Sequence, residues 1–299
     1  MKALRILFLL FSITACSDQN TEQESSEPYM SDNPKIQIRL EQSIDELLKS
    51  SPLPFAKDCL EPVGMCWYEV SKRFAALDLP SVEIIQGHHE LHLDQVTQLT
   101  VVINEALGTD IQNISMVVRG LPDDSPHEAQ KAFIYQLIFQ LGAAGWQHVY
   151  HPGDPRIPGT EADKIDTPRL IFGQFVASHP WLDPQHEPSL EHWLKVGNFY
   201  NWFFHNAGAY LHLKAQRRNS RAAPADTGTY LISLEFLSES AKWRGDFEQM
   251  DKDNWQQLLP ERLQQYRQQR EALEAQARQA GIVIDESYQD PPIKALLAP

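Results

Sequence analysis

Two kinds of apolar periodicity alternate along this chain of 299 residues and limit the folds that it can adopt. Short segments with an apolar residue at every second position follow one another, and a pattern that steps by three and four residues closes each series. The first kind predicts strands with one buried face, and the second predicts an amphipathic helix. We therefore predict an α+β fold of antiparallel sheets, each covered by a helix. Two similar modules are one arrangement that this order allows.

The first module is expected within residues 36–160. A capping box at Ser43-Ile44-Asp45-Glu46 predicts a short helix that ends before Pro52. The clearest helix opens at Ser125-Pro126-His127-Glu128, which supplies a cap, a proline in the first turn and a glutamate three places on. Strand patterns cover residues 82–85, 88–93, 97–103, 114–119 and 146–150. We expect the long helix to lie on the sheet that these strands form.

The second module is expected within residues 161–299, and the boundary lies within a long connection rich in proline, glycine and aspartate at residues 151–188. Its expected elements are a short helix at 189–196, a hairpin of 199–205 and 209–216 around Asn206-Ala207-Gly208, a strand at 230–236 and a helix from Asp253 or Pro260 to Ala280. An apolar stripe from Leu259 to Ala277 favours packing of the last helix on the second sheet over packing on a partner helix.

The first sixteen residues indicate export from the cytoplasm. Lys2 and Arg5 accompany an apolar run that is too short to cross about 30 Å of hydrocarbon. The run ends in Ile13-Thr14-Ala15-Cys16, which resembles the lipobox of bacterial lipoproteins. The resemblance implies a signal peptide at residues 1–15, cleavage before Cys16 and a stable anchor of acyl chains, such as palmitate, on that cysteine. An ordinary signal peptide with an incidental cysteine is the alternative.

The residues after Cys16 bear on the destination. In the commonest sorting rule of this class, serine at the next position permits transfer to the outer membrane, and Ser17 stands there, although Asp18 follows. The resemblance thus implies a lipid-anchored protein on the periplasmic face of the outer membrane. Residues 16–35 are polar and are expected to form a flexible tether.

Cys59 and Cys66 remain once Cys16 carries lipid. An even pair in an oxidising compartment predicts a disulfide, and the proline and glycine between the two cysteines favour a turn. Such a bridge would hold a local turn. Free thiols and metal ligands are the alternatives, although six intervening residues is not the spacing of a zinc site.

The charge of the chain limits its partners. The formal charge is −14, from 26 basic and 40 acidic side chains. Nucleic acids and anionic lipid surfaces attract basic patches, so this balance argues against either as the main partner. A cationic protein partner is compatible with it.

One cluster has the composition of a metal site. If residues 88–93 form a strand, His88, Glu90 and His92 point to the same side, about 7 Å apart along the strand. Two imidazoles and a carboxylate are ligands that zinc accepts. A solvated strand face without any cofactor is the alternative interpretation.

Two further groups are candidates for contact with a protein partner. Asp154, Arg156 and Glu161 lie in the long loop, where binding residues are often found; internal ion pairs that lock the loop are the alternative. Trp202 and Phe204 belong to a dense aromatic hairpin, which would serve either as a binding patch or as packing between the modules.

The sequence contains no nucleophile elbow, phosphate loop or dinucleotide fingerprint, and we predict a binding protein rather than an enzyme. The chain resembles the lipoprotein immunity proteins that neutralise type VI secretion effectors. The resemblance lies in the lipobox, Gly145-Trp146, Asp154-Pro155-Arg156, Gly159-Thr160-Glu161-Ala162 and Asn201-Trp202-Phe203-Phe204. It implies a stoichiometric inhibitor that plugs the active site of a toxin, with acidic side chains meeting a basic cleft.

Two alternatives belong to other classes: a metal-dependent envelope hydrolase and a structural or assembly lipoprotein of the outer membrane. The hydrolase predicts stoichiometric zinc in the purified protein, because His88, Glu90 and His92 would be its ligands. Metal analysis of the wild type and of His92→Ala tests this. Zinc that is lost in the variant supports the hydrolase, whereas a metal-free wild type contradicts this form of it.

Overall fold

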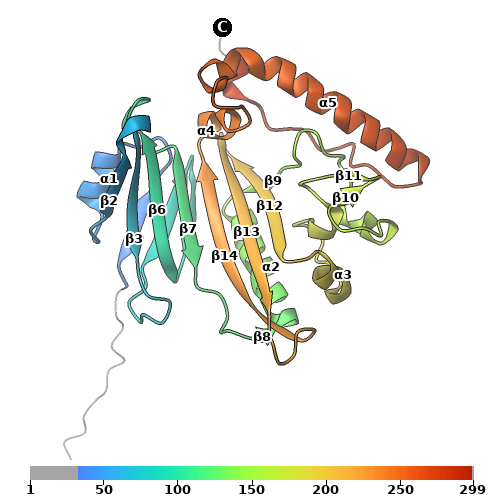
Figure 1. Cartoon of the computed structure of the whole chain (residues 1–299), viewed down its shortest axis with the longest axis horizontal. Helices are drawn as coiled ribbons and strands as arrows, with labels where there is room; N and C mark the ends of the chain where they lie inside the picture. Colours follow the sequence, from blue (N-terminus) through green and yellow to red (C-terminus); the bar gives the residue numbers. More distant parts are fainter. Residues whose placement is uncertain (1–32, 298–299) are drawn as a thin grey trace, which may run out of the picture. The chain divides into compact units, whose positions relative to one another are not determined.

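A nine-stranded sheet runs through the part of the chain that the computed structural model describes, residues 33–297 (Figure 1). The predicted signal peptide, Cys16 and most of the tether lie outside these residues. The strands of the sheet are β2 (Ala56–Leu60), β3 (Met65–Ser71), β6 (Val96–Asn104), β7 (Asn113–Val118), β8 (Ser125–Pro126), β9 (Gln147–His148), β12 (Phe199–Asn206), β13 (Ala209–Asn219) and β14 (Thr227–Leu237). Their order is β2-β3-β6-β7-β14-β13-β12-β9, and β8 pairs with β14.

Two smaller sheets and five α-helices complete the described residues. β1 (Lys35–Ile38), β4 (Ser81–Gln86) and β5 (His89–Leu93) form one small sheet, and β10 (Leu170–Ile171) and β11 (Gln174–Phe175) form the other. The helices are α1 (Ile44–Ser50), α2 (His127–Ala143), α3 (Leu190–Lys195), α4 (Glu239–Arg244) and α5 (Trp255–Gln279). This mixture of antiparallel strands and helices confirms the predicted α+β class. None of the described helices is both long and apolar enough to cross a membrane.

The two expected series of strands meet in one sheet. β7, from the first series, pairs with β14, from the second, and Met116 lies opposite Leu234. Side chains of both series also share the main hydrophobic core. The sheet therefore continues across the boundary expected at residues 160 and 161, and the described residues belong to a single compact unit.

The hairpin of β12 and β13 forms where the turn residues indicate it. Asn206 pairs with Ala209, which leaves a two-residue loop of Ala207 and Gly208 with φ of 48° and 89°. Two positive φ angles define the mirror-image turn whose twist matches that of antiparallel strands, and glycine adopts such an angle without strain. The turn thereby fixes the register that places Phe203 opposite His212.

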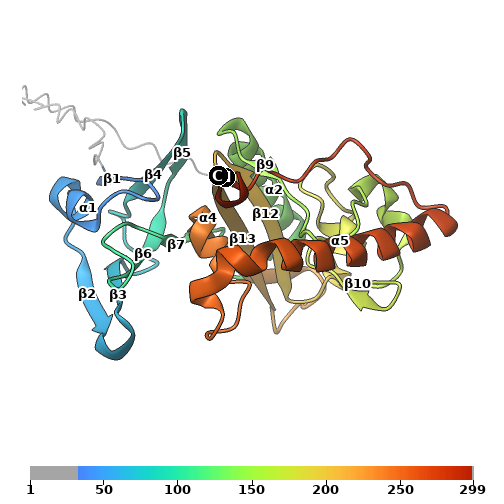
Figure 2. The same cartoon turned by 90° about the horizontal axis from the view of Figure 1, so that it is seen from above.

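The hairpin and β14 carry different side chains on their two faces. Trp202 and Phe204 are buried on the face that α2 covers, and the ring of Tyr135 from α2 meets that of Trp202 edge-on at 6.3 Å. Phe203 and His212 belong to the opposite face. Figure 2 shows α2 and α5 on opposite sides of β12 and β13.

α5 is packed near both of its ends. Toward its start, Leu259 joins a cluster with Tyr210, Trp243, Phe247 and Trp255. Toward its end, Leu273 and Ala277 join apolar side chains of the long loop, namely Ile157, Ile165, Ile171 and Val176. The apolar stripe is therefore buried at its two ends, against α4 and the long loop.

Ion pairs fasten the second half of α5 to the loop. The Arg156 guanidinium donates to both carboxylate oxygens of Glu274, at 2.7 and 2.8 Å, and the Glu274 side chain is only 3% exposed. Arg270 donates to the backbone oxygens of His151 and Asp154 and to the Asp290 carboxylate. These bonds tie the helix to the long loop, which lies far from it in sequence, and to the C-terminal segment that follows it.

The predicted disulfide is present. Cys59 and Cys66 face each other across β2 and β3, and their sulfurs are bonded. The bridge spans the turn between two adjacent strands, as the sequence predicted, and it does not connect distant parts of the fold.

We predict that Glu274→Gln destabilises the protein by about 2–4 kcal/mol, because Arg156 would keep a half-buried charge without its partner. Burial alone would raise the pKa of Glu274, but the hydrogen bonds and charge of Arg156 hold it below its ordinary value. The stabilisation is thus complete above about pH 4.3 and is lost as pH falls through the lower pKa of the folded state. Urea unfolding of both proteins at pH 7 and pH 3 measures the loss.

Glu191→Gln is the matched control. Glu191 pairs with Lys195 one helical turn away, but both side chains are exposed. Its removal should leave the stability nearly unchanged, because exposed ion pairs are screened by solvent. Equal effects of the two substitutions would contradict the role assigned to Glu274.

Candidate ligand-binding cavity

The predicted zinc ligands remain separate. His88, Glu90 and His92 are exposed, and His92 Nε2 lies 2.9 Å from the Asp94 carboxylate. Within residues 33–297, a set of three ligand-type side chains with atoms all within 4.8 Å of one another occurs at Cys59, Cys66 and Glu105. The structure does not bring the two histidines and Glu90 together in such a set.

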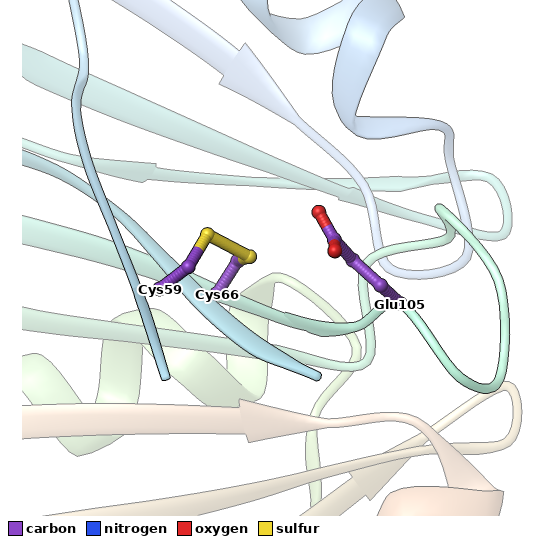
Figure 3. A group of neighbouring side chains, drawn as sticks. All are labelled: Cys59, Cys66 and Glu105. Atoms are coloured by element: carbon purple, nitrogen blue, oxygen red, sulfur yellow. A yellow bond between two sulfur atoms is a disulfide. The ribbon is translucent and has the colours of Figure 1, made fainter. Parts of the chain in front are cut away.

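The set at Cys59, Cys66 and Glu105 has a different explanation (Figure 3). Both sulfurs are used in the disulfide, so neither offers a thiolate, the form of cysteine that binds metal. Glu105 in turn lies 3.4 Å from the Lys57 ammonium. The three side chains meet because a cross-strand bridge lies beside a loop that carries an acidic residue.

The three charged residues predicted to meet a partner are instead turned inward. Asp154 is 2% exposed and accepts hydrogen bonds from the backbone N–H groups of Ala177 and Ser178. Arg156 holds Glu274, and Glu161 accepts from Lys164 and from the backbone of Val283. Because these groups are occupied by internal bonds, they present no charged epitope in this structure. The contacts agree with the alternative of a loop locked by ion pairs.

The two aromatic residues predicted to meet a partner are also internal. Trp202 is 1% exposed and Phe204 is 2% exposed. Alternation along β12 directs both toward the core beneath α2, where large rings are needed to fill the space. The other face of the hairpin has the unexpected feature.

A cavity of about 600 Å³ lies on that face, between the sheet and the middle of α5. The volume is within the range of about 300–1,000 Å³ that is typical of small-molecule sites. Sheet residues, α4, α5, the loop after β9 and the C-terminal segment all contribute to its wall. The cavity is thus built from parts of the chain that are distant in sequence.

The floor of the cavity is the outer face of β12, β13 and β14. Phe203 stacks on His212, with ring centroids 4.5 Å apart, and Tyr210 lies opposite Leu237. Burial lowers the pKa of His212 to about 4, so this imidazole is neutral at pH 7. Its Nε2 is paired with the Asn201 side chain at 2.8 Å. The floor is therefore largely aromatic, and its carboxylate, Glu235 opposite His212, is paired with Lys214.

The roof combines apolar side chains from three elements. Leu263 of α5, Trp243 of α4 and Ile293 of the C-terminal segment all line the cavity. The C-terminal segment is held in place because the backbone N–H groups of residues 294 and 295 donate to the Glu239 carboxylate, at the start of α4. The C-terminal part of the roof is therefore held against the start of α4.

The carboxylates in the wall all have cationic partners. Glu235 pairs with Lys214 at 2.7 Å, and Asp246 pairs with Lys242 at 2.9 Å. The third carboxylate, Asp290, receives two hydrogen bonds from Arg270. Arg267, which lines the cavity one turn after Leu263, has no ion pair within residues 33–297. The paired charges cancel, and one arginine remains uncompensated.

Two buried polar atoms of the wall, Tyr210 Oη and Trp243 Nε1, form no hydrogen bond of good geometry among the described residues. Burial raises the pKa of Tyr210, and the neighbouring Trp243 N–H offsets part of that rise, so the two groups interact weakly with each other. Both side chains are less than a tenth exposed, and their rings meet edge-on with centroids 5.9 Å apart. Buried donors are nearly always paired in folded proteins, so each unpaired group requires an explanation.

The sequence held only partial signals for this site. The dense rings of the hairpin were one signal, because alternation places large rings on both faces of the strand, and Phe203 lies on the face that lines the cavity. The arginine at position 270, within an apolar stripe, was a second signal, because a charge there requires buried partners. The contribution of α4 and of the C-terminal segment has no counterpart in local sequence patterns.

Comparisons with protein-family models, with curated proteins and with solved structures found no match to this chain.

Proposed function

We propose that this chain is a lipid-anchored binding protein of the bacterial cell envelope and that the cavity beneath α5 is its binding site. The sequence supports the location through the lipobox at Cys16 and the serine that follows it. The observation that carries the binding role is the cavity itself, with its volume of about 600 Å³ and its wall of aromatic and aliphatic side chains.

Such a wall favours binding by removing apolar ligand surface from water. Each Å² of apolar surface that is buried contributes about 25 cal/mol. Because ion pairs and apolar clusters fasten α5 on both sides of the cavity, little conformational entropy has to be lost when a ligand enters. A preformed site of this kind suits reversible retention of a ligand.

The proposed binding site differs from the site that the sequence predicted. The resemblance to immunity proteins placed it at Asp154, Arg156 and the aromatic hairpin, whose predicted contact residues are engaged inside the fold. The inhibitory role stays a prediction, and the cavity is the surface on which we locate binding.

We predict that the protein binds one equivalent of the neutral fluorophore N-phenylnaphthylamine and that Leu263→Trp weakens this binding about tenfold or more. A larger side chain at Leu263 would occupy space beneath the middle of α5, and tenfold corresponds to about 1.4 kcal/mol of lost contact. Fluorescence titration measures the affinity. For this measurement the protein is produced from residue 17 onward, without the acylated cysteine. A lipidated protein would require detergent, and detergent would compete for an apolar cavity.

Leu77→Trp is the matched control, since Leu77 is 90% exposed and does not line the cavity. It should leave affinity and stoichiometry unchanged, and circular dichroism should show that both variants are folded. Binding that is equally strong in a folded Leu263→Trp protein would contradict the proposed site.

A further inference from the structure

The unpaired donors specify what the ligand has to carry. An indole N–H only donates, so the partner of Trp243 must be an acceptor atom. The neighbouring Tyr210 hydroxyl can donate to the same kind of group. Both atoms are buried in the wall of the cavity without a partner among residues 33–297. A ligand oxygen would satisfy the bonding capacity that the fold leaves unused.

The charge balance of the cavity wall indicates the sign of the charge that the ligand carries. Glu235, Asp246 and Asp290 are neutralised by Lys214, Lys242 and Arg270. The two wall histidines, His151 and His212, have pKa values lowered mainly by burial, so both are neutral at pH 7. The guanidinium of Arg267 is thus the uncompensated charge among the described residues that line the cavity.

The rest of the wall specifies the body of the ligand. Phe203, Leu237, Leu263 and Ile293 offer apolar surface on the floor and the roof. A fully polar anion would leave these side chains without apolar contacts, and a hydrocarbon would leave the donors unpaired.

We propose that the cavity binds an amphipathic monoanion, a molecule with one apolar chain or ring system and one carboxylate-type group. The apolar body lies against Phe203, Leu237 and Leu263. The oxygens accept hydrogen bonds from Trp243 and Tyr210, and Arg267 supplies the opposite charge. This inference rests on the proposed function, because it requires the cavity to be the binding site.

Competition with N-phenylnaphthylamine tests the class of ligand, with dodecanoate and dodecan-1-ol as paired probes below their aggregation limits. The two share an apolar chain and differ in the anionic group. We predict that dodecanoate displaces the fluorophore at lower concentration and that Arg267→Gln weakens dodecanoate about threefold to tenfold while the alcohol is unaffected. Arg221→Gln makes the same charge change at an exposed arginine that does not line the cavity, and it should alter neither affinity.

Tyr210→Phe tests the donors. Because the Tyr210 hydroxyl has no partner among the described residues, its removal should leave the melting temperature of the free protein unchanged or raised, yet weaken dodecanoate about threefold to tenfold. Tyr230→Phe is the control, since its buried hydroxyl bonds to Trp193 and lies 3.0 Å from His127 Nδ1. It should lower the melting temperature and keep the preference for dodecanoate.

The outcomes separate the two proposals. If the fluorophore does not bind at all, the proposed function fails. If the fluorophore and dodecanol bind but dodecanoate binds no more tightly than dodecanol, the cavity is still a binding site and the proposed anionic ligand class is wrong. A preference for dodecanoate that survives both Arg267→Gln and Tyr210→Phe would also overturn the inference, because the anion would then be recognised elsewhere.

Discussion

The fastening of α5 on both sides of its middle is the constraint from which the cavity follows. Leu259 is packed beside α4, and Leu273 is packed on the long loop, fourteen residues or about 21 Å further along the helix. Between these points the helix, which contains Pro260, passes over strands of a twisted sheet. A helix fixed at two points above a twisted surface cannot follow that surface everywhere. The space left under its middle is the cavity.

Arg270 shows why a charged residue interrupts the apolar stripe of this helix. Its guanidinium donates to two backbone oxygens of the long loop and to Asp290 of the C-terminal segment. The His151 oxygen also accepts from the Asp154 N–H, but an aliphatic side chain at position 270 would remove the donor to the Asp154 oxygen in a buried place, which costs free energy. One side chain therefore joins the helix, the loop and the C-terminal segment, and all three contribute to the wall of the cavity.

The sequence predicted the local elements well and their assembly poorly, for one physical reason. Alternation records which face of a strand is buried, so the hairpin around Ala207 and the strand at residues 230–236 were identified. Alternation does not record which strand lies alongside, so the pairing of β7 with β14 was not predicted. The charged loop shows the same limit: Arg156 looked exposed because its partner, Glu274, lies 118 residues away.

The composition of the cavity wall is more informative than its size. Phenylalanine at position 210 would pack as tyrosine does, and it would not leave a hydroxyl unpaired among the described residues. The indole N–H of Trp243, whose ring contacts the ring of Tyr210 edge-on, has a similar desolvation cost. Unpaired polar groups reduce the stability of the ligand-free protein. They are expected at binding sites, where the bound ligand supplies the missing hydrogen bonds and stability is lost in favour of function. Arg267 is exposed at the same cavity and has no ion-pair partner among the described residues, whereas the acidic groups of the wall are paired. The buried donor pair and Arg267 therefore line one cavity, and a ligand that carries both an acceptor and a negative charge accounts for these features together.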